Sequence, residues 1–185
     1  MTTTQENHPE ETRAREELLN SVPILSPRPT GKHILIASRL GGILSSLFDR
    51  GHGGPGGWWI LSEPEILMPG SKCIPDIAGW RRERMPQIPN GYLFEVCPNW
   101  VCEVISDGSR KTDRKVKPPI YLKGGVSYLW LIEPESRTLE VLEGTPNGWL
   151  AVQSFSDDEV VRAKPFDAVE LDLFEVWGDE QRRIE

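Results

Sequence analysis

Several residue types and segment types are scarce in this sequence of 185 residues. It has three cysteines, at positions 73, 97 and 102, without a C-x-x-C spacing, and three widely separated histidines. This pattern argues against a disulfide framework or a zinc knuckle and indicates a reducing compartment, so we expect a cytoplasmic protein. No apolar run approaches the roughly 18 residues of a membrane span, and we expect no membrane association. The polar, acidic N-terminus lacks the pattern of a signal peptide.

The charge of the chain is unevenly distributed. It has 28 acidic and 21 basic residues, a net charge of −7, whereas the footprint of a nucleic-acid-binding protein is usually basic. Residues 1–20 carry a net charge of −3 and residues 175–185 a net charge of −2, so the body between them is almost neutral. Basic residues gather over 81–84 and 110–117. The net charge therefore leaves DNA open as a partner and predicts weak, salt-sensitive binding.

The length fits a single domain. We expect a disordered acidic tail over residues 1–16, one domain over 17–177 and a C-terminal tail over 178–185. The 17 glycines and 16 prolines predict many turns rather than long helices. Hydrophobic spacing and turn residues predict helices over 31–48 (capped by Thr30), 107–123 and 171–177, and strands over 58–61 continuing through 63–68, 73–80, 100–106, 128–133, 139–143 and 149–155.

Two acidic residues interrupt predicted strands at positions where apolar side chains are expected. Asp76 lies within IPDIA (74–78) and Glu103 within VCEVI (101–105). Strands rarely bury a carboxylate unless it is paired or binds a cation. Two carboxylates on neighbouring strands would form a hard-oxygen site for Mg²⁺, which can activate water and neutralise charge on a phosphoryl oxygen. The alternative is that one or both form ordinary salt bridges at strand edges.

A charged segment, DRKVK (113–117), follows Glu103 within 14 residues. A lysine in this segment could reach a metal site on the strands, orient the attacking water and stabilise a pentavalent phosphate. The commoner fate of such a segment is a solvated helix face. His33 is interpreted as structural. The glycine-rich stretch over 53–57 lacks the G-x-x-x-x-G-K-[ST] pattern of a phosphate loop and is interpreted as a turn or lid.

Four motifs occur in a fixed order along the chain. They are PD (75–76), EVIS (103–106), D-x-x-x-K-x-x-x-Y (113–121) and GV-x-x-x-WLI-x-P (125–134). Together with segments between about residues 17 and 177, they resemble the Uma-two family ("putative restriction endonuclease") of the PD-(D/E)XK nuclease superfamily. The resemblance implies an α/β fold with a mixed α+β sheet. Its restriction-endonuclease-like core would run helix-strand-strand-strand-helix-strand, with additional antiparallel strands.

The resemblance also implies a metal-dependent endonuclease that hydrolyses DNA phosphodiester bonds. Asp76 and Glu103 would bind Mg²⁺ or Mn²⁺, with the carbonyl of Val104 as a further candidate ligand. The superfamily lysine usually lies two residues after the glutamate, where this chain has isoleucine, so Lys117 of the next helix is the catalytic candidate. Two further acidic residues, Glu17 and Asp113, are candidate site residues whose role is left open. The candidate substrate-binding residues come from the basic clusters and are Arg81, Arg82, Arg114 and Lys115.

Three departures from the family pattern keep other functions open. Residues 106–109 read SDGS rather than Ser-Pro-Ser-Thr, and residues 20–21 read Asn-Ser rather than Asp-Gly, with Pro23 in the strand that follows. Pro118 and Pro119 directly follow Lys117 and restrict where its helix can start. The alternatives are a catalytically impaired binding or accessory protein with the nuclease fold, or a hydrolase of small phosphoesters. A homodimer is also left open.

Overall fold

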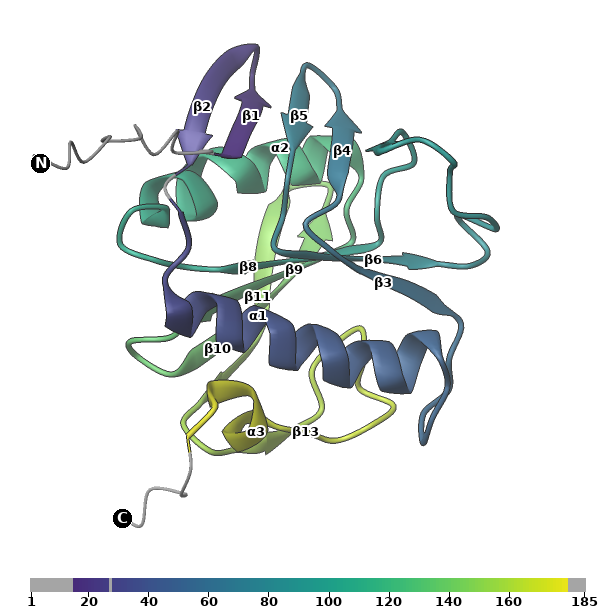
Figure 1. The fold of residues 1–185 in the computed structure, drawn as a ribbon, viewed down its shortest axis with the longest axis vertical. Helices are drawn as coiled ribbons and strands as arrows, with labels where there is room; N and C mark the ends of the chain where they lie inside the picture. The colour runs from purple at the N-terminus through teal and green to yellow at the C-terminus, as the bar shows by residue number, and fades with distance from the viewer. Residues whose placement is uncertain (1–14, 27, 180–185) are drawn as a thin grey trace, which may run out of the picture.

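A six-stranded mixed sheet forms the centre of the computed structural model, which describes residues 15–26 and 28–179 (Figure 1). The strand order is β11-β10-β9-β8-β6-β3. Strands β8 and β9 run parallel, and the other neighbours are antiparallel. The strands are β3 (Trp58–Ser62), β6 (Ile77–Arg81), β8 (Trp100–Val104), β9 (Tyr128–Glu133), β10 (Thr138–Thr145) and β11 (Gly148–Ser156).

A second sheet has the order β2-β1-β5-β4-β7. Its strands are β1 (Arg15–Leu19), β2 (Val22–Ser26), β4 (Glu65–Met68), β5 (Ser71–Cys73) and β7 (Leu93–Phe94), and a separate pair is formed by β12 (Val160–Val161) and β13 (Leu171–Asp172). The helices are α1 (Gly31–Leu44), α2 (Lys117–Gly124) and α3 (Leu173–Trp177). A π-helical turn, η1 (Ser45–Asp49), follows α1, and another, η2 (Thr112–Val116), leads into α2.

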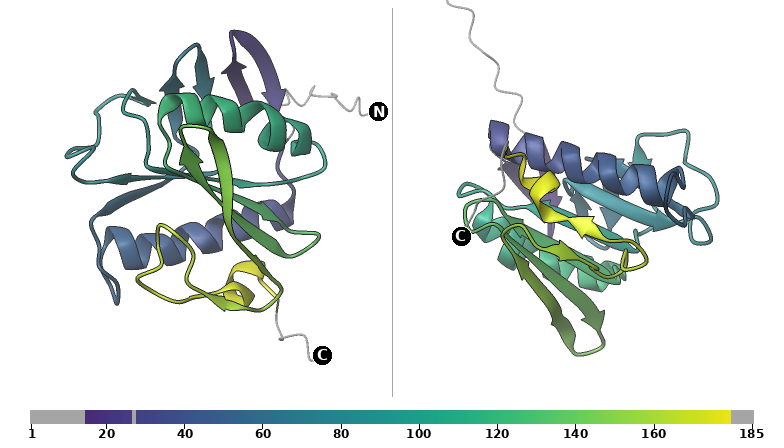
Figure 2. Two further views of the ribbon diagram at one scale, coloured as in Figure 1. Left: turned by 180° about the vertical axis from the view of Figure 1, so that it is seen from behind. Right: turned by 90° about the horizontal axis from the view of Figure 1, so that it is seen from below.

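Helices α1 and α2 cover opposite faces of the six-stranded sheet (Figure 2). The period-2 alternation of β8 shows how one strand serves both faces: Trp100 and Cys102 join the core beneath α1, and Val101 joins the core beneath α2. Glu103 follows the same alternation and lies on the α2 side. The order α1, β3, β6, β8, α2, β9 confirms the expected core, and β10 and β11 are the additional antiparallel strands.

Three predicted boundaries are wrong. The strand expected over 73–80 is two strands in different sheets, and Asp76 lies in the link just before β6 rather than in mid-strand. The segment 63–68 does not continue β3, because the chain turns at Glu63, where φ is 50°, and β4 joins the second sheet. Strand β1 begins at Arg15, inside the tail expected over 1–16. Residues 1–14 and 180–185 of the expected tails lie outside the described residues.

The N-terminal hairpin tolerates the sequence departures found there. Asn20 and Ser21 both have positive φ, 51° and 63°, as the two-residue turn between β1 and β2 requires. Pro23 lies in β2 and pairs with Leu18 of β1. Strand β2 is an edge strand of its sheet, where a missing N–H is tolerated. The hairpin that carries Glu17 is therefore intact.

The start of α1 follows the prediction, and its end differs in geometry. The Thr30 hydroxyl accepts a hydrogen bond from the His33 N–H at 3.3 Å, a regular N-cap. Helical structure continues past Leu44 through η1, close to the predicted end at residue 48. Of the helices within residues 15–26 and 28–179, none combines the length and apolarity that a membrane crossing needs.

Phe166 is the centre of an aromatic cluster beneath α1. Its ring centroid lies 4.7 Å from Phe48, 4.9 Å from Trp58, 4.9 Å from Trp100 and 5.6 Å from Trp130. Two of these partners lie on neighbouring strands of the central sheet, and Phe166 comes from the C-terminal segment. The aromatic cluster thus packs the C-terminal segment that carries Phe166 against the six-stranded sheet.

We expect Phe166→Ala to lower the free energy of unfolding by about 3–5 kcal/mol, because it leaves a cavity among four aromatic rings. The matched control is Tyr92→Ala, since Tyr92 is 81% exposed, and it should cost less than about 0.5 kcal/mol. Urea denaturation followed by far-UV circular dichroism measures both. Equal losses in the two variants would contradict this account of the core.

Candidate functional site

Four acidic side chains and one lysine converge in the interior from separate elements. Glu17 comes from β1, Asp76 from the link before β6, Glu103 from β8, Asp113 from η2 and Lys117 from the start of α2. All five residues are at most 5% exposed. Ile77 pairs with Cys102, so Asp76 and Glu103 lie side by side at the ends of neighbouring strands.

Lys117 is the hub of this cluster. Its Nζ lies 3.2 Å from Glu103 Oε1, 3.3 Å from Glu17 Oε1 and 3.3 Å from Asp113 Oδ1. Asp113 precedes Lys117 by four residues and therefore shares its helix face. One ammonium group thus contacts three carboxyl groups, and burial strengthens each of these interactions.

The two prolines after Lys117 do not displace it. The turn η2 is π-helical, and the Lys117 N–H donates to the Thr112 carbonyl, five residues earlier. Pro118 and Pro119 then occupy the first turn of α2, where a missing N–H costs least. The change of helical register and the proline pair together place Lys117 toward the sheet.

Further contacts fix the carboxyl groups of the two glutamates. Glu17 Oε1 accepts the Ile74 N–H at 2.7 Å, and its Oε2 accepts the Ser26 hydroxyl at 3.3 Å. The buried Tyr121 hydroxyl donates to Glu103 Oε1. Glu17, whose role the sequence leaves open, therefore connects the N-terminal hairpin to the segment that carries Asp76.

Asp76 is held by two groups that sequence reasoning did not assign to it. Its Oδ1 lies 3.0 Å from His33 Nε2, and its Oδ2 accepts the Val104 N–H at 2.8 Å. Val104 thus meets the site through its amide, whereas the sequence pointed to its carbonyl. From the sequence, His33 is interpreted as a structural residue, and no spacing along the chain indicates its contact with Asp76.

The pKa shifts of the buried groups show that the site has more carboxyl groups than the single lysine can neutralise. Burial raises the pKa of Glu103 well above its usual range, against the opposing pull of Lys117, and burial also raises that of Asp113. Burial alone would lower the pKa of Lys117, but the carboxylates of Glu103, Asp113 and Glu17 outweigh it, so Lys117 is an ammonium ion. Burial opposes the charge of Asp76 as well, yet the contacts with His33 and Val104 lower its pKa overall.

The donor set fits a hard divalent cation. The site holds four carboxyl groups and one lysine, which contacts three of them. Burial raises the pKa of Glu103 and of Asp113, so a bound cation would stabilise their ionised forms. Among the residues the structure describes, no three His, Cys, Asp or Glu side chains form a ready-made metal cage. The Lys117 ammonium lies between three of the carboxyl groups instead.

A small pocket and an adjoining cleft lead from this cluster to the surface. The pocket, of about 30 Å³, has room for a water molecule and is lined by Ser26, Pro29, His33, Asp76, Glu103, Ser106, Ser109, Asp113 and Lys117. The cleft, of about 270 Å³, shares His33 and Ser106 with the pocket. We call it the entrance cleft; it is lined by Arg28, Thr30, Lys32, His33, Ile105, Ser106, Asp107, Gly108, Arg110, Pro134 and Glu135.

None of the four basic residues expected to bind substrate lines the pocket or the entrance cleft. Arg81 lies at the far end of β6 from Asp76, with its guanidinium 4.7 Å from the Trp58 ring. Two of the others are held in ion pairs: Arg82 with Asp49 at 2.6 Å, and Arg114 with Glu133 at 2.6 Å and Glu140 at 2.7 Å. Lys115 is exposed on η2.

A family model described as "Putative restriction endonuclease", Uma2, matches residues 4–173. This chain belongs to the Uma2 family. A crystal structure of a putative nuclease belonging to DUF820 from Anabaena variabilis ATCC 29413 has the same fold, with a TM-score of 0.74 and 23% identity over 91% of this chain and 93% of that chain. The comparison with curated proteins gives no match. The family and the fold class expected from the motifs are thereby confirmed.

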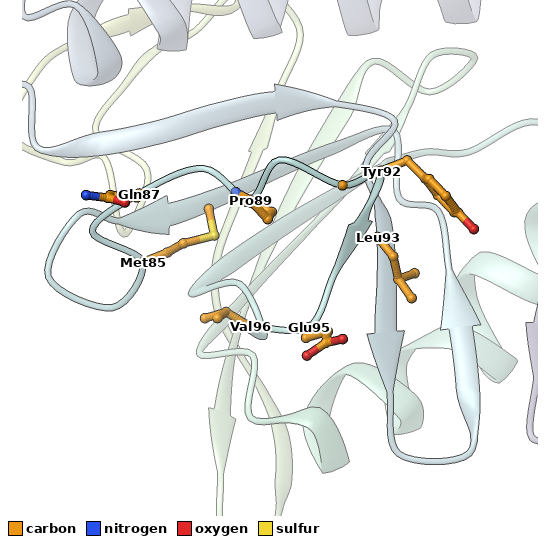
Figure 3. Close-up of a pocket in the computed structure, with 8 residues that line it drawn as sticks. Met85, Gln87, Pro89, Tyr92, Leu93, Glu95 and Val96 are labelled. Carbon is orange, nitrogen blue, oxygen red and sulfur yellow. The ribbon is translucent and has the colours of Figure 1, made fainter.

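This Uma2 protein has a larger pocket, of about 550 Å³, away from the carboxylates. It is formed by residues 85–96 of the connection between β6 and β8, and its lining is mainly apolar (Figure 3). Glu95 is the one charged residue among the residues that line it. This pocket has a single carboxylate and no basic side chain, so it suits neither a divalent cation nor a phosphate. The carboxylate cluster is therefore the candidate site, although its pocket is smaller.

We expect Lys117→Met to destabilise the metal-free Uma2 protein by about 3–5 kcal/mol near neutral pH, because it leaves buried carboxylates uncompensated. A carboxyl group whose pKa is raised by folding contributes stability below its unfolded pKa and loses it as pH rises. The deficit of the variant should therefore grow from about pH 5 to pH 8 in EDTA. Thermal unfolding at both pH values measures this, with Lys115→Met as the exposed control. A deficit independent of pH would contradict the charge assignment.

Proposed function

We propose that this Uma2 protein is a divalent-metal-dependent endonuclease that hydrolyses DNA phosphodiester bonds. The observation that carries the proposal is the buried cluster itself. Asp76, just before β6, lies beside Glu103 of the neighbouring strand β8, and Lys117 contacts Glu103, in a pocket that connects to the surface. Membership of a family described as restriction endonucleases supports a nuclease, and enzymes of this fold generally use divalent metals.

Asp76 and Glu103 would hold Mg²⁺ or Mn²⁺, with the Val104 carbonyl as a further candidate ligand. Glu17 is a carboxylate within reach of the same lysine and is a candidate to complete the set. A bound ion of this kind supplies an acidified water and neutralises charge on a phosphoryl oxygen. Hard oxygen ligands and the excess of negative charge both suit such an ion.

The surrounding residues have roles that follow from their contacts. The Lys117 ammonium lies beside Glu103, so it would donate a hydrogen bond that orients the attacking water and supply a positive charge for the phosphate in the transition state. His33 and the Val104 amide orient Asp76. The Tyr121 hydroxyl orients Glu103 in the same way. These contacts preorganise the two metal-binding carboxylates.

The structure bears on the alternative of an impaired accessory protein. One ground for it was that Pro118 and Pro119 would keep Lys117 away from the strands. Lys117 instead lies 3.2 Å from Glu103, which supports the catalytic proposal. The altered SDGS segment forms a turn closed by a hydrogen bond from the Ser106 N–H to the Ser109 hydroxyl, and it lines the pocket without obstructing Lys117.

We expect Asp76→Asn and Glu103→Gln each to reduce DNA cleavage by at least about 100-fold, because each removes a charged ligand from the metal. Plasmid and single-stranded DNA with Mg²⁺ or Mn²⁺ are the substrates. The matched control is Glu65→Gln, which alters a half-buried carboxylate paired with Lys72 in the second sheet and should keep activity.

Full activity in either site variant, or in excess EDTA, would overturn the proposed mechanism. Hydrolysis of a nucleotide phosphoester without any cleavage of DNA would select the small-phosphoester alternative. Circular dichroism confirms that each variant is folded, so that loss of activity reports on the site.

Metal binding can be tested without any substrate. Mn²⁺ at about 100 times its dissociation constant should stabilise the wild-type protein by about 2.7 kcal/mol, because a ligand that binds the folded state raises its stability. The double variant Asp76→Asn/Glu103→Gln should lose this gain. Thermal unfolding with and without Mn²⁺ measures it, and an identical gain in the double variant would show that the metal binds elsewhere.

A further inference from the structure

The entrance cleft adjoins the carboxylate pocket on the side where three connections meet. One wall is the start of α1, with Thr30 and Lys32. The others are the connection from β8 to η2 and the turn after β9, where Pro134 lies. Figure 1 shows these segments on the same side of the molecule. Any group that reaches the pocket through this cleft passes between them.

The cleft is richer in positive than in negative side chains. Arg28, Lys32 and Arg110 line it, against Asp107 and Glu135. The side chain of Asp107 is 96% exposed and therefore strongly solvated. The approach to an acidic centre is thus basic, which is what a polyanionic substrate requires if it is to come near four buried carboxyl groups.

Two of the three basic residues keep a charge that no ion pair neutralises within the described part of the chain. Lys32 Nζ donates to a neutral group, the Pro134 carbonyl, at 3.3 Å, and Arg28 has no carboxylate partner there. Arg110 differs, because it pairs with Glu133 at 2.9 Å. Arg28 and Lys32 are accordingly the residues best prepared to bind an incoming anion.

The N-terminus of α1 adds to the positive potential of this wall. Its first N–H groups have no partner within the helix and carry the positive end of the helix dipole. His33, which is 8% exposed and lines both the cleft and the pocket, has an Nδ1 with no hydrogen-bond partner among the described residues. A buried polar atom without a partner at this junction is a second sign that a ligand completes the site.

We propose that the entrance cleft binds one strand of the DNA substrate, and that Arg28 and Lys32, aided by Arg110, hold the phosphate adjacent to the one that is cleaved. This inference rests on the proposed function and assigns the main substrate contacts to Arg28 and Lys32, which lie outside the predicted basic clusters, with a smaller contribution from Arg110 of the second cluster. A volume of about 270 Å³ accommodates a short segment of one backbone, so the rest of a bound strand or duplex would lie outside the cleft.

The test compares Arg28→Gln/Lys32→Gln with Arg50→Gln/Lys123→Gln, which removes the same charge from exposed residues outside the cleft. Binding of a short fluorescent oligonucleotide, single-stranded and duplex, is followed by anisotropy in EDTA over a range of salt concentrations. The cleft variant should bind about tenfold more weakly. Its salt slope should fall by about 0.7 on single strands and about 0.9 on duplex, because the neutralisation of one phosphate is lost.

In Mg²⁺, the cleft variant should raise KM for DNA and leave kcat near the wild-type value, because the lost contacts position the substrate. Arg110→Gln alone should show a smaller change of the same kind. Equal binding by the cleft variant and the control, or no DNA binding by the wild type, overturns the inference.

The two proposals fail separately. If Asp76-dependent cleavage is present but the cleft variant matches the control, the cleft assignment is wrong and the nuclease proposal stands. If the wild type cleaves no DNA with either metal while the cleft variant loses DNA binding and its control does not, the nuclease proposal is wrong and the cleft assignment stands.

Discussion

The contact of one buried ammonium with three carboxyl groups is the constraint on which the site depends. Lys117 joins β1, β8 and η2 through Glu17, Glu103 and Asp113, so it couples the second sheet to the central one. A buried charge is tolerated only while its partners are in place. The N-terminal hairpin is therefore part of the site, because it supplies Glu17.

The helix that carries Lys117 is shaped for this contact. A π-helical turn is rare and costs hydrogen-bond quality, yet here it precedes a proline pair that an α-helical interior would reject. The prolines fix the start of α2, and the wider turn before them lets Asp113 and Lys117 face the sheet together. The π-helical turn η2 and the two prolines thus together fix the orientation of Lys117.

Much of the fold was predictable from local patterns, and contacts between distant elements were not. Alternation along β8 identifies Glu103 as buried, and the motif order gives the sheet core. The contact between His33 and Asp76 depends on how α1 docks at the end of β6, which no spacing along the chain encodes. Asp76 itself was assigned to a strand because IPDIA is apolar, whereas the chain changes sheets there.

The same reasoning explains why the basic cluster over 81–84, which follows Asp76 in the sequence, does not line the pocket or the entrance cleft. A strand rises about 3.3 Å per residue, so β6 carries Arg81 roughly 16 Å from Asp76 at its other end. Residues that follow a site along a strand are led away from it. Residues on neighbouring elements that begin or end at the same ends of the strands are brought toward it, as Lys32 at the start of α1 and Arg110 after β8 are. The residues that line the entrance to this site therefore come from segments far apart in the sequence, and they are found only once the sheet order is known.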